Sequence, residues 1–231
     1  MTSTRTVEGL ADRQGLFSEV RRRSKDVSPG DVRPKEGPWI SISRQLGSGG
    51  SVLAGRVAEL LGWKSYDREI VSAIADGTHS QEILLDRFDE RGVPQVDEYL
   101  TPLIVPDDPG QARYLVEMTR VIGRIARQGQ AVLVGRGANW FLTPSCGLRV
   151  RAFGALEARV AALAHVARLD LEEARRRCET NDAAQRSFIK QGWNRDIDDP
   201  SGYDLILNPL DLGLPAAVEA VIAAARTKLA L

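Results

Sequence analysis

The chain has 231 residues, of which 43% are hydrophobic and 27% are charged. Its 31 basic and 31 acidic residues balance to a formal net charge of zero, which argues against a protein that coats nucleic acid, although a local basic cleft stays compatible with it. The length suits one α/β domain with a full core, or such a domain with an insertion.

The cysteine content and the hydropathy of the chain narrow the class of protein further. Cys146 and Cys178 form no C-x-x-C pair, and only His79 and His165 are available to join them, so neither a zinc site nor a disulfide framework is supported. No apolar run reaches the roughly 18 residues that span a bilayer, and the N-terminus lacks an apolar signal core. We therefore expect a cytoplasmic protein that acts on neither a membrane nor a nucleic acid.

Residues 1–37 are predicted to form a polar, flexible extension ahead of a single domain over residues 38–231. An arginine triplet at 21–23 and a Ser-Pro-Gly sequence at 28–30 interrupt any long regular element. A solvated tail is the expectation for this composition, while apolar residues between Leu10 and Val20 leave open a short helix that docks on the domain or on a partner.

Residues 38–62 have the pattern of a strand, a glycine-rich loop and a helix. A short β-prone run at 39–42 precedes the loop, and apolar residues recur at helical spacing over 52–61, with Gly62 as a stop signal. Glycines let backbone N–H groups turn around an anion, and the helix that follows directs its positive end to the same place. We therefore predict that the loop binds the phosphates of a nucleotide triphosphate. The candidate residues are Gly47, Ser48, Gly49, Gly50 and Ser51.

The loop matches the phosphate-binding pattern G-x-x-x-x-G-K-[ST] at two of its four fixed positions. Gly49 and Ser51 match, and Ser51 is a candidate hydroxyl ligand for Mg²⁺. Arg44 stands at the first glycine position and Gly50 at the lysine position. The cation that contacts the β- and γ-phosphates is thus missing from its usual place. Arg44, whose guanidinium is always charged, is the nearest substitute in sequence.

The next segment continues the alternation of strands and helices. Residues 64–66 are predicted to be a brief extended piece, and Asp67 suits the N-cap of a helix over 68–75. A further helix is expected over 81–91, and a connection rich in Pro and Asp over 93–110. The apolar stripe of the amphipathic helix predicted over 113–128 is expected to face the core.

Residues 131–134, Ala-Val-Leu-Val, have no alternation, which favours a central parallel strand covered on both faces. Ligands of open α/β sheets gather beyond the carboxyl ends of the strands, where Gly135, Arg136 and Gly137 follow. The planar fork of Arg136 suits a monophosphate, and the alternative is an arginine that ties the loop to a carboxylate.

The C-terminal third contains the densest basic segment of the chain. A strand over 147–153 and a helix over 155–167 are followed by a helix that Asp170 and Glu173 open as a capping box. Adjacent helical residues point about 100° apart, so the three arginines at 175–177 do not all face one ligand. A strand at 203–207 and an amphipathic helix at 214–229 close the chain. The other basic residues of the segment are Arg186, Lys190 and Arg195.

Three segments together resemble the cytidylate kinase-like family. ISISRQLGSGG with the downstream YDREIV is similar to the family's I-S-R-x-x-G-S-G-G and Y-D-R-E-I, AVLVGRGANWFL to its second apolar strand, and YDLILN to its C-terminal strand. The resemblance runs in consistent order over about 38–231. It implies a three-layer α/β/α domain of the P-loop NTPase type, with a parallel sheet of about five strands and a helical lid over about 168–199.

The resemblance also implies roles for particular residues. It places the turn at Asp67 and Arg68 beside the acceptor together with Arg136, and there a carboxylate would orient Mg²⁺ or a substrate hydroxyl. Lid arginines Arg186 and Arg195 would join Arg44 in catalysis. One departure is Gly137, where cytidylate kinase itself has an acid.

The expected function is transfer of a phosphoryl group from ATP, with Mg²⁺, to a nucleoside monophosphate, in particular a cytidine nucleotide. Because Gly50 replaces the lysine, a second hypothesis stays open: a noncatalytic protein that binds a nucleotide, or only a partner, in a regulatory or assembly role. A third is a kinase for another small phosphate acceptor. The oligomeric state is left open by the sequence.

Overall fold

The computed structural model describes residues 36–67 and 109–231. Several predictions lie outside these residues: the extension up to residue 35, Arg68, the helices over 68–75 and 81–91, and the connection from 93 to 108. The first two described residues already belong to the domain. The Glu36 carboxylate accepts hydrogen bonds from Trp39 Nε1 and from the backbone N–H of Thr143, and the Gly37 N–H donates to the Ala126 carbonyl.

A parallel sheet with the strand order β2-β3-β1-β4-β5 forms the centre of the molecule. The central strand β1 pairs with β3 on one side and with β4 along its whole length on the other. The predicted parallel five-stranded sheet is therefore confirmed. The strands are β1 (Trp39–Arg44), β2 (Lys64–Tyr66), β3 (Ala131–Val134), β4 (Gly147–Ala152) and β5 (Leu205–Leu207).

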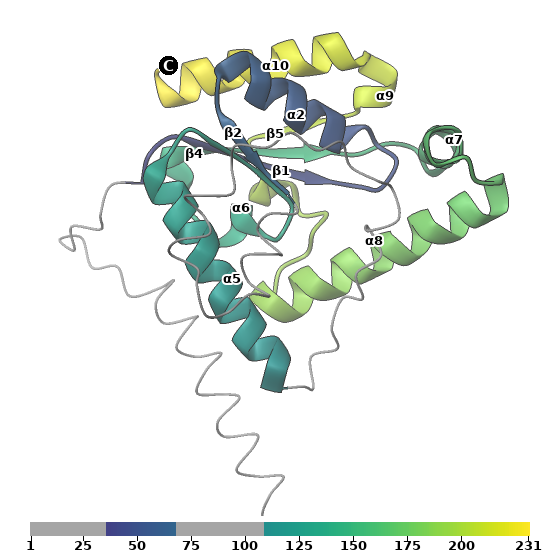
Figure 1. The fold of residues 1–231 in the computed structure, drawn as a ribbon, viewed down its shortest axis with the longest axis horizontal. Coiled ribbons are helices and arrows are strands. Elements are labelled where there is room, and N and C mark those ends of the chain that lie inside the picture. The colour runs from purple at the N-terminus through teal and green to yellow at the C-terminus, as the bar shows by residue number, and fades with distance from the viewer. Residues whose placement is uncertain (1–35, 68–108) are drawn as a thin grey trace, which may run out of the picture.

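Helices cover both faces of the sheet and make the predicted three layers (Figure 1). One face carries α2 (Gly50–Leu61) and α10 (Leu214–Leu229). The other carries α5 (Pro109–Gln128), the short α6 (Ala138–Phe141) and the C-terminal half of α8 (Leu171–Trp193). The remaining elements are α7 (Leu156–Ala167), α9 (Pro209–Leu212) and two 3-10 helices, η2 (Pro144–Cys146) and η3 (Pro200–Gly202).

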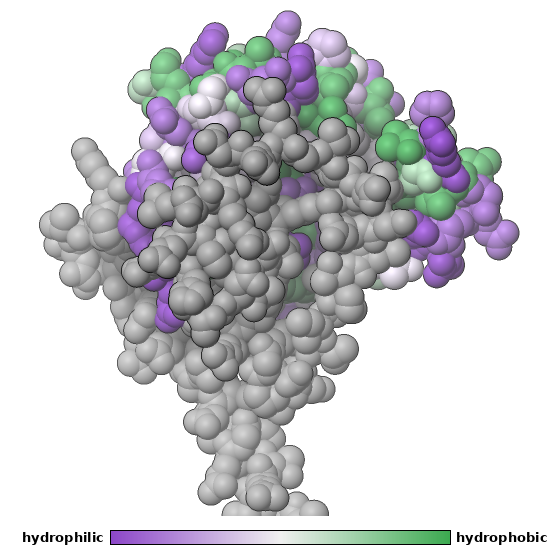
Figure 2. Space-filling model, viewed as in Figure 1, coloured by the Kyte–Doolittle hydropathy of each residue, from purple (hydrophilic) through white to green (hydrophobic). Residues whose placement is uncertain are grey.

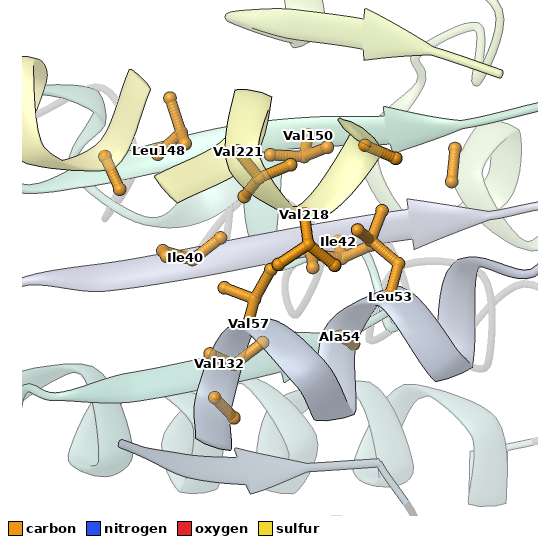
Figure 3. Close-up of a cluster of buried hydrophobic side chains, with 14 of the residues drawn as sticks. Ile40, Ile42, Leu53, Ala54, Val57, Val132, Leu148, Val150, Val218 and Val221 are labelled. Carbon is orange, nitrogen blue, oxygen red and sulfur yellow. The ribbon is translucent and has the colours of Figure 1, made fainter. Parts of the chain in front are cut away.

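The side chains of β1 alternate between two hydrophobic cores. Ile40 and Ile42 pack with Leu53 and Val57 of α2 and with residues of α10 (Figure 3), while Trp39 packs on the opposite face with α5. All of these side chains are buried. The double coverage explains why the central strands lack a polar face. Because β1 pairs in parallel with β3 and β4, the carboxyl ends of the three strands lie at one edge of the sheet, where α2 begins.

Helix α8 is packed along its length rather than at one end. Ala174 and Cys178 are buried against α7, and Phe188 and Ile189 are buried in the core beneath α5. Asp170 caps the helix, because its side chain accepts a hydrogen bond from the Glu173 N–H at 2.7 Å. None of the described helices, α8 included, is long and apolar enough to cross a bilayer.

The arginine triplet of α8 forms ion pairs with glutamates. Arg175 pairs with Glu157 of α7, and Arg176 and Arg177 both pair with Glu173. The surface at the α7 end of the molecule accordingly mixes hydrophilic and hydrophobic residues (Figure 2). These pairs are those of a solvated helix face.

Asp204 joins the start of β5 to β4 and α10. Its carboxylate accepts hydrogen bonds from the Arg149 N–H at 2.8 Å, from Arg149 Nη2 at 2.9 Å and from Lys228 Nζ. Burial alone would raise the pKa of this carboxyl, but the hydrogen bonds from Arg149 and Lys228 outweigh it and lower the pKa to about 2.

We expect Asp204→Asn to lower the free energy of unfolding near neutral pH and to have less effect in acid. A carboxyl whose pKa is depressed by folding stabilises the fold above its unfolded pKa of about 4, and this contribution is lost as the pH falls toward about 2. Urea unfolding of the wild type and of Asp204→Asn, at neutral pH and at a series of pH values through that acidic range, measures this contribution. A difference in stability that is as large at the acidic end as at neutral pH would contradict this assignment.

Candidate phosphate-binding site

The glycine-rich loop connects the carboxyl end of β1 to α2. Its turn is closed by the Gln45 carbonyl, which accepts hydrogen bonds from the Ser48 N–H at 3.2 Å and from Ser48 Oγ at 2.7 Å. Gly47 and Gly49 have φ angles of 80° and 78°, which glycine adopts without strain. The buried Ser48 hydroxyl also accepts from the Gly50 N–H at 3.3 Å, so this side chain shapes the loop from inside.

The loop offers a set of unused backbone donors. The N-cap residue of α2, Gly49, has no side chain that could accept a hydrogen bond from the first turn of the helix. Over the described part of the chain, the N–H groups of Leu46, Gly47, Gly49 and Ser51 have no hydrogen-bond partner. Unsatisfied donors at the positive end of a helix dipole are the features that bind anions. The arrangement has the properties that the sequence predicts for a phosphate-binding loop.

Arg44, the last residue of β1, links this loop to the end of β2. Its Nε donates a hydrogen bond to Ser51 Oγ at 3.2 Å, in the first turn of α2. Its Nη2 donates to both oxygens of the Asp67 carboxylate, at 3.1 and 3.2 Å. One guanidinium therefore joins two of the predicted site residues, and it supplies a positive charge beside the loop.

Gly50 packs directly against Arg44, so the two departures from the P-loop pattern depend on each other. A Cβ atom on residue 50 would lie 2.4 Å from the Cβ of Arg44 and 2.9 Å from the Cβ of Ala152. Neither neighbour is the flexible end of a side chain, so neither can move aside cheaply. While position 44 carries a side chain, a lysine does not fit at position 50.

We expect Gly50→Lys to destabilise the protein, by about 1–3 kcal/mol for an overpacked buried site. Arg44→Gly combined with Gly50→Lys restores the glycine and the lysine of the pattern and removes the nearer clash. The double variant should therefore be more stable than Gly50→Lys alone, by an amount that thermal or urea unfolding of the four proteins of the cycle measures. Additive effects of the two substitutions would show that the positions are not coupled.

Arg136 lies in a left-handed turn at the carboxyl end of β3. Gly135, Arg136 and Gly137 have φ angles of 71°, 59° and 70°. This conformation costs a non-glycine residue about 1–2 kcal/mol, and such strain concentrates at functional sites. The half-buried Arg136 side chain forms no hydrogen bond or ion pair with any other described residue. A Cβ on Gly135 would lie 2.7 Å from Arg44 Nη1, so the turn is in contact with the Arg44 guanidinium.

The space beside Gly137 is filled by Trp193, the last residue of α8. A Cβ on Gly137 would lie 2.6 Å from Cζ3 of the indole ring. The ring also stacks on Phe141, with 5.9 Å between centroids. The position that carries an acid in cytidylate kinase thus serves here as a packing surface for the end of α8.

The other two predicted catalytic arginines have partners of their own. Arg186, which is half exposed, donates from Nε to Asp198 Oδ2 at 3.2 Å. The guanidinium of Arg195 lies over the Trp140 ring, 5.8 Å from its centroid. Within the described chain neither arginine forms a hydrogen bond or ion pair with the glycine-rich loop, whereas Arg44 does.

Arg151 was missed by the sequence analysis. It lies on β4 and is buried, donating from Nη1 to Ser43 Oγ at 2.8 Å and from Nη2 to Asp198 Oδ1 at 3.1 Å. Asp198 therefore bridges Arg151 in the sheet and Arg186 on α8. The available signal was a pair of arginines, Arg149 and Arg151, alternating with apolar residues in a short strand, because a buried charge requires a partner.

The oxygen atoms that Mg²⁺ prefers are present at the site. The Ser51 hydroxyl and the Asp67 carboxylate are suitable ligands, and both contact Arg44. Among the described residues no group of three or more His, Cys, Asp or Glu side chains is placed to hold a metal ion by itself. Magnesium is commonly held by one or two side chains together with phosphate oxygens and water, and this donor set fits that arrangement.

The fold is that of an α/β protein with a glycine-rich loop between its first strand and the helix that follows. Residues 39–209 match the model of the cytidylate kinase-like family, and the chain belongs to this family. Membership indicates a nucleotide kinase-like function. The crystal structure of an uncharacterized protein from Eubacterium ventriosum is similar in fold, with a TM-score of 0.63 and 19% identity over 84% of this chain and 99% of that one. No curated protein matches this chain significantly.

Proposed function

We propose that the protein transfers the γ-phosphoryl group of ATP to a nucleoside monophosphate, with a cytidine nucleotide as the preferred acceptor through the family resemblance. The observation that supports it most is the guanidinium of Arg44 beside a loop with unused N–H donors. Phosphoryl transfer depends on positioning and on charge neutralisation more than on a covalent nucleophile. These are the two properties that the loop and Arg44 provide.

The donor phosphates bind the N–H groups of Gly47, Gly49 and Ser51, and Arg44 replaces the missing lysine. To reach the phosphates, Arg44 exchanges some of its contacts with Ser51 and Asp67 for phosphate oxygens. The Ser51 hydroxyl and the Asp67 carboxylate are the side-chain oxygens that would hold Mg²⁺, which would neutralise charge on the phosphate groups. In this proposal Arg44 supplies its charge already in the resting enzyme.

The acceptor phosphate binds Arg136. Its guanidinium is unpaired within the described residues, and its turn is in contact with Arg44, so donor and acceptor phosphates would lie near each other. Arg186 and Arg195 would contribute only after leaving Asp198 and Trp140. Arg68, the remaining acceptor candidate, lies outside the described residues.

A noncatalytic nucleotide-binding role is the second candidate, and one observation favours it. Arg44 is already paired with the Asp67 carboxylate, so part of its charge is compensated before any phosphate arrives. In that case the protein binds a nucleotide without turnover, and the nucleotide-bound form would have a regulatory or assembly role.

Calorimetry with Mg²⁺-ATP, in the absence of an acceptor, tests the role of Arg44. Because a hydrogen bond to a charged group contributes about 1.5–3 kcal/mol, Arg44→Ala should weaken binding about ten-fold or more. Arg186→Ala should leave this affinity unchanged. Arg56→Ala is the matched control, because Arg56 is an exposed arginine of α2 whose partner among the described residues is Glu59. Equal effects of Arg44→Ala and Arg56→Ala on the affinity for Mg²⁺-ATP would remove Arg44 from the site.

The same measurement tests the loop itself. If millimolar Mg²⁺-ATP gives no binding heat, and Gly49→Val changes nothing, the loop is structural.

A coupled ADP-release assay with a panel of nucleoside monophosphates and other small acceptors tests turnover. We expect a cytidine nucleotide to be the best acceptor, and Arg136→Ala to raise the KM of the acceptor far more than the Kd of ATP. An equal loss for both ligands would reject the assignment of Arg136. Tight ATP binding with no turnover on any acceptor would favour the noncatalytic role.

A further inference from the structure

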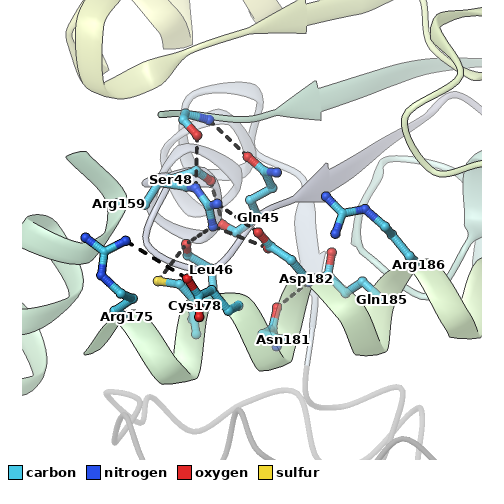
Figure 4. A network of polar contacts seen from close by, with 12 residues as sticks. Gln45, Leu46, Ser48, Arg159, Arg175, Cys178, Asn181, Asp182, Gln185 and Arg186 are labelled. Atoms are coloured by element: carbon cyan, nitrogen blue, oxygen red, sulfur yellow. Dashed lines mark hydrogen bonds and ion pairs between the residues drawn. The ribbon is translucent and has the colours of Figure 1, made fainter. Parts of the chain in front are cut away.

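A buried arginine of α7, Arg159, donates a hydrogen bond to the backbone of the glycine-rich loop. Arg159 is only 3% exposed, and its guanidinium contacts three acceptors (Figure 4). Nε donates to the Gly154 carbonyl at 3.0 Å, and Nη1 donates to the Leu46 carbonyl at 3.1 Å. The Asp182 carboxylate of α8 accepts from Nη1 at 3.3 Å and from Nη2 at 2.8 Å.

Two further contacts hold the same part of the loop. The Cys178 thiol of α8 donates to the Leu46 carbonyl at 3.7 Å, and burial raises the pKa of this thiol, which keeps the proton in place. Gly47 lies directly on α7, because a Cβ there would be 2.4 Å from the Arg159 carbonyl oxygen. The loop therefore packs on the α7–α8 pair through its backbone.

These contacts fix the orientation of the peptide group between Leu46 and Gly47. In a planar trans peptide the C=O and the following N–H point in opposite directions, and no cis peptide bond occurs among the described residues. The Leu46 carbonyl points toward Arg159, so the Gly47 N–H points away from it. The Gln45 carbonyl, held by Ser48, fixes the Leu46 N–H in the same manner.

We propose that Arg159, paired with Asp182, is a positioning residue that turns the Gly47 N–H toward the donor phosphates. This inference rests on the proposed function only for the identity of the anion. The effect is geometric rather than a long-range attraction, because the Asp182 carboxylate compensates the charge of Arg159 and both side chains are almost completely buried. Asp182 lies in the middle of the predicted lid, so this segment also sets the shape of the loop.

A charge-neutral double variant separates loop orientation from stability. Arg159→Met with Asp182→Leu removes both charges of the pair, and apolar replacement of a buried ion pair is often neutral for stability. The matched control is Arg149→Met with Asp204→Leu, which removes a partly buried pair. Within the described residues, the other hydrogen bonds of these two side chains go to Ser201 and Lys228 and not to the loop. Arg159→Lys keeps the charge but presents fewer donors to the three acceptors, and it serves if the double variant does not fold.

Three measurements on the full chain test this inference. They are thermal unfolding, calorimetric binding of Mg²⁺-ATP and of inorganic tripolyphosphate, and NMR exchange of the Ser48 and Gly50 amide protons. Both Arg159 variants should bind the two ligands about ten-fold or more weakly, because one oriented N–H is lost to a charged phosphate. Exchange of the two loop amides should become faster. The control variant, whatever its melting temperature, should keep wild-type affinity and exchange.

Wild-type affinity and exchange in a folded Arg159 variant would overturn the inference, as would an equal loss of affinity in the control at equal stability. If the wild-type protein binds neither ligand, the donor site of the proposed function fails. Amide exchange in the free protein then still decides whether Arg159 orients the loop.

Discussion

The site depends on the contact between Arg44 and Gly50. The backbone of residue 50 lies so close to the Arg44 side chain that a lysine is excluded there while the arginine is present. Considered singly, each departure from the P-loop pattern removes a functional feature. Considered together, they move the positive charge from the first turn of α2 to the end of β1. The contact with Ser51 shows that the guanidinium remains within hydrogen-bonding distance of the residue beside the missing lysine.

The sheet brings the remaining groups to this charge. Because β1 lies between β3 and β4, its carboxyl end is flanked by the Arg136 turn on one side and by Arg151 on the other. β2 adds Asp67 from beyond β3. Helices α7 and α8 then hold the loop from behind through Arg159 and Asp182. Three of the arginines around the loop, Arg44, Arg151 and Arg159, thus pair with three different carboxylates. Arg136 has no such partner within the described residues.

Local signals were sufficient to predict the framework of the fold. Apolar periodicity predicted α5 and its buried stripe, the Asp170 cap predicted the start of α8, and the unbroken apolar run predicted β3 as a central strand. The partners of buried polar groups were not predictable, because they join residues remote in sequence. Arg151 and Ser43 are 108 positions apart, and Arg159 and Leu46 are 113 apart. The short helices α6 and α9 contain too few residues to show a helical period.

A crystal structure with Mg²⁺ and a non-hydrolysable ATP analogue tests the central claim most directly. The account predicts a triphosphate in the loop, with the Gly47 and Gly49 N–H groups and the Arg44 guanidinium on the β- and γ-phosphate oxygens. Arg44 should then have released at least one of its contacts to Asp67 or Ser51. A triphosphate bound elsewhere, or one bound in the loop while Arg44 keeps all its present contacts and touches no phosphate, would contradict it.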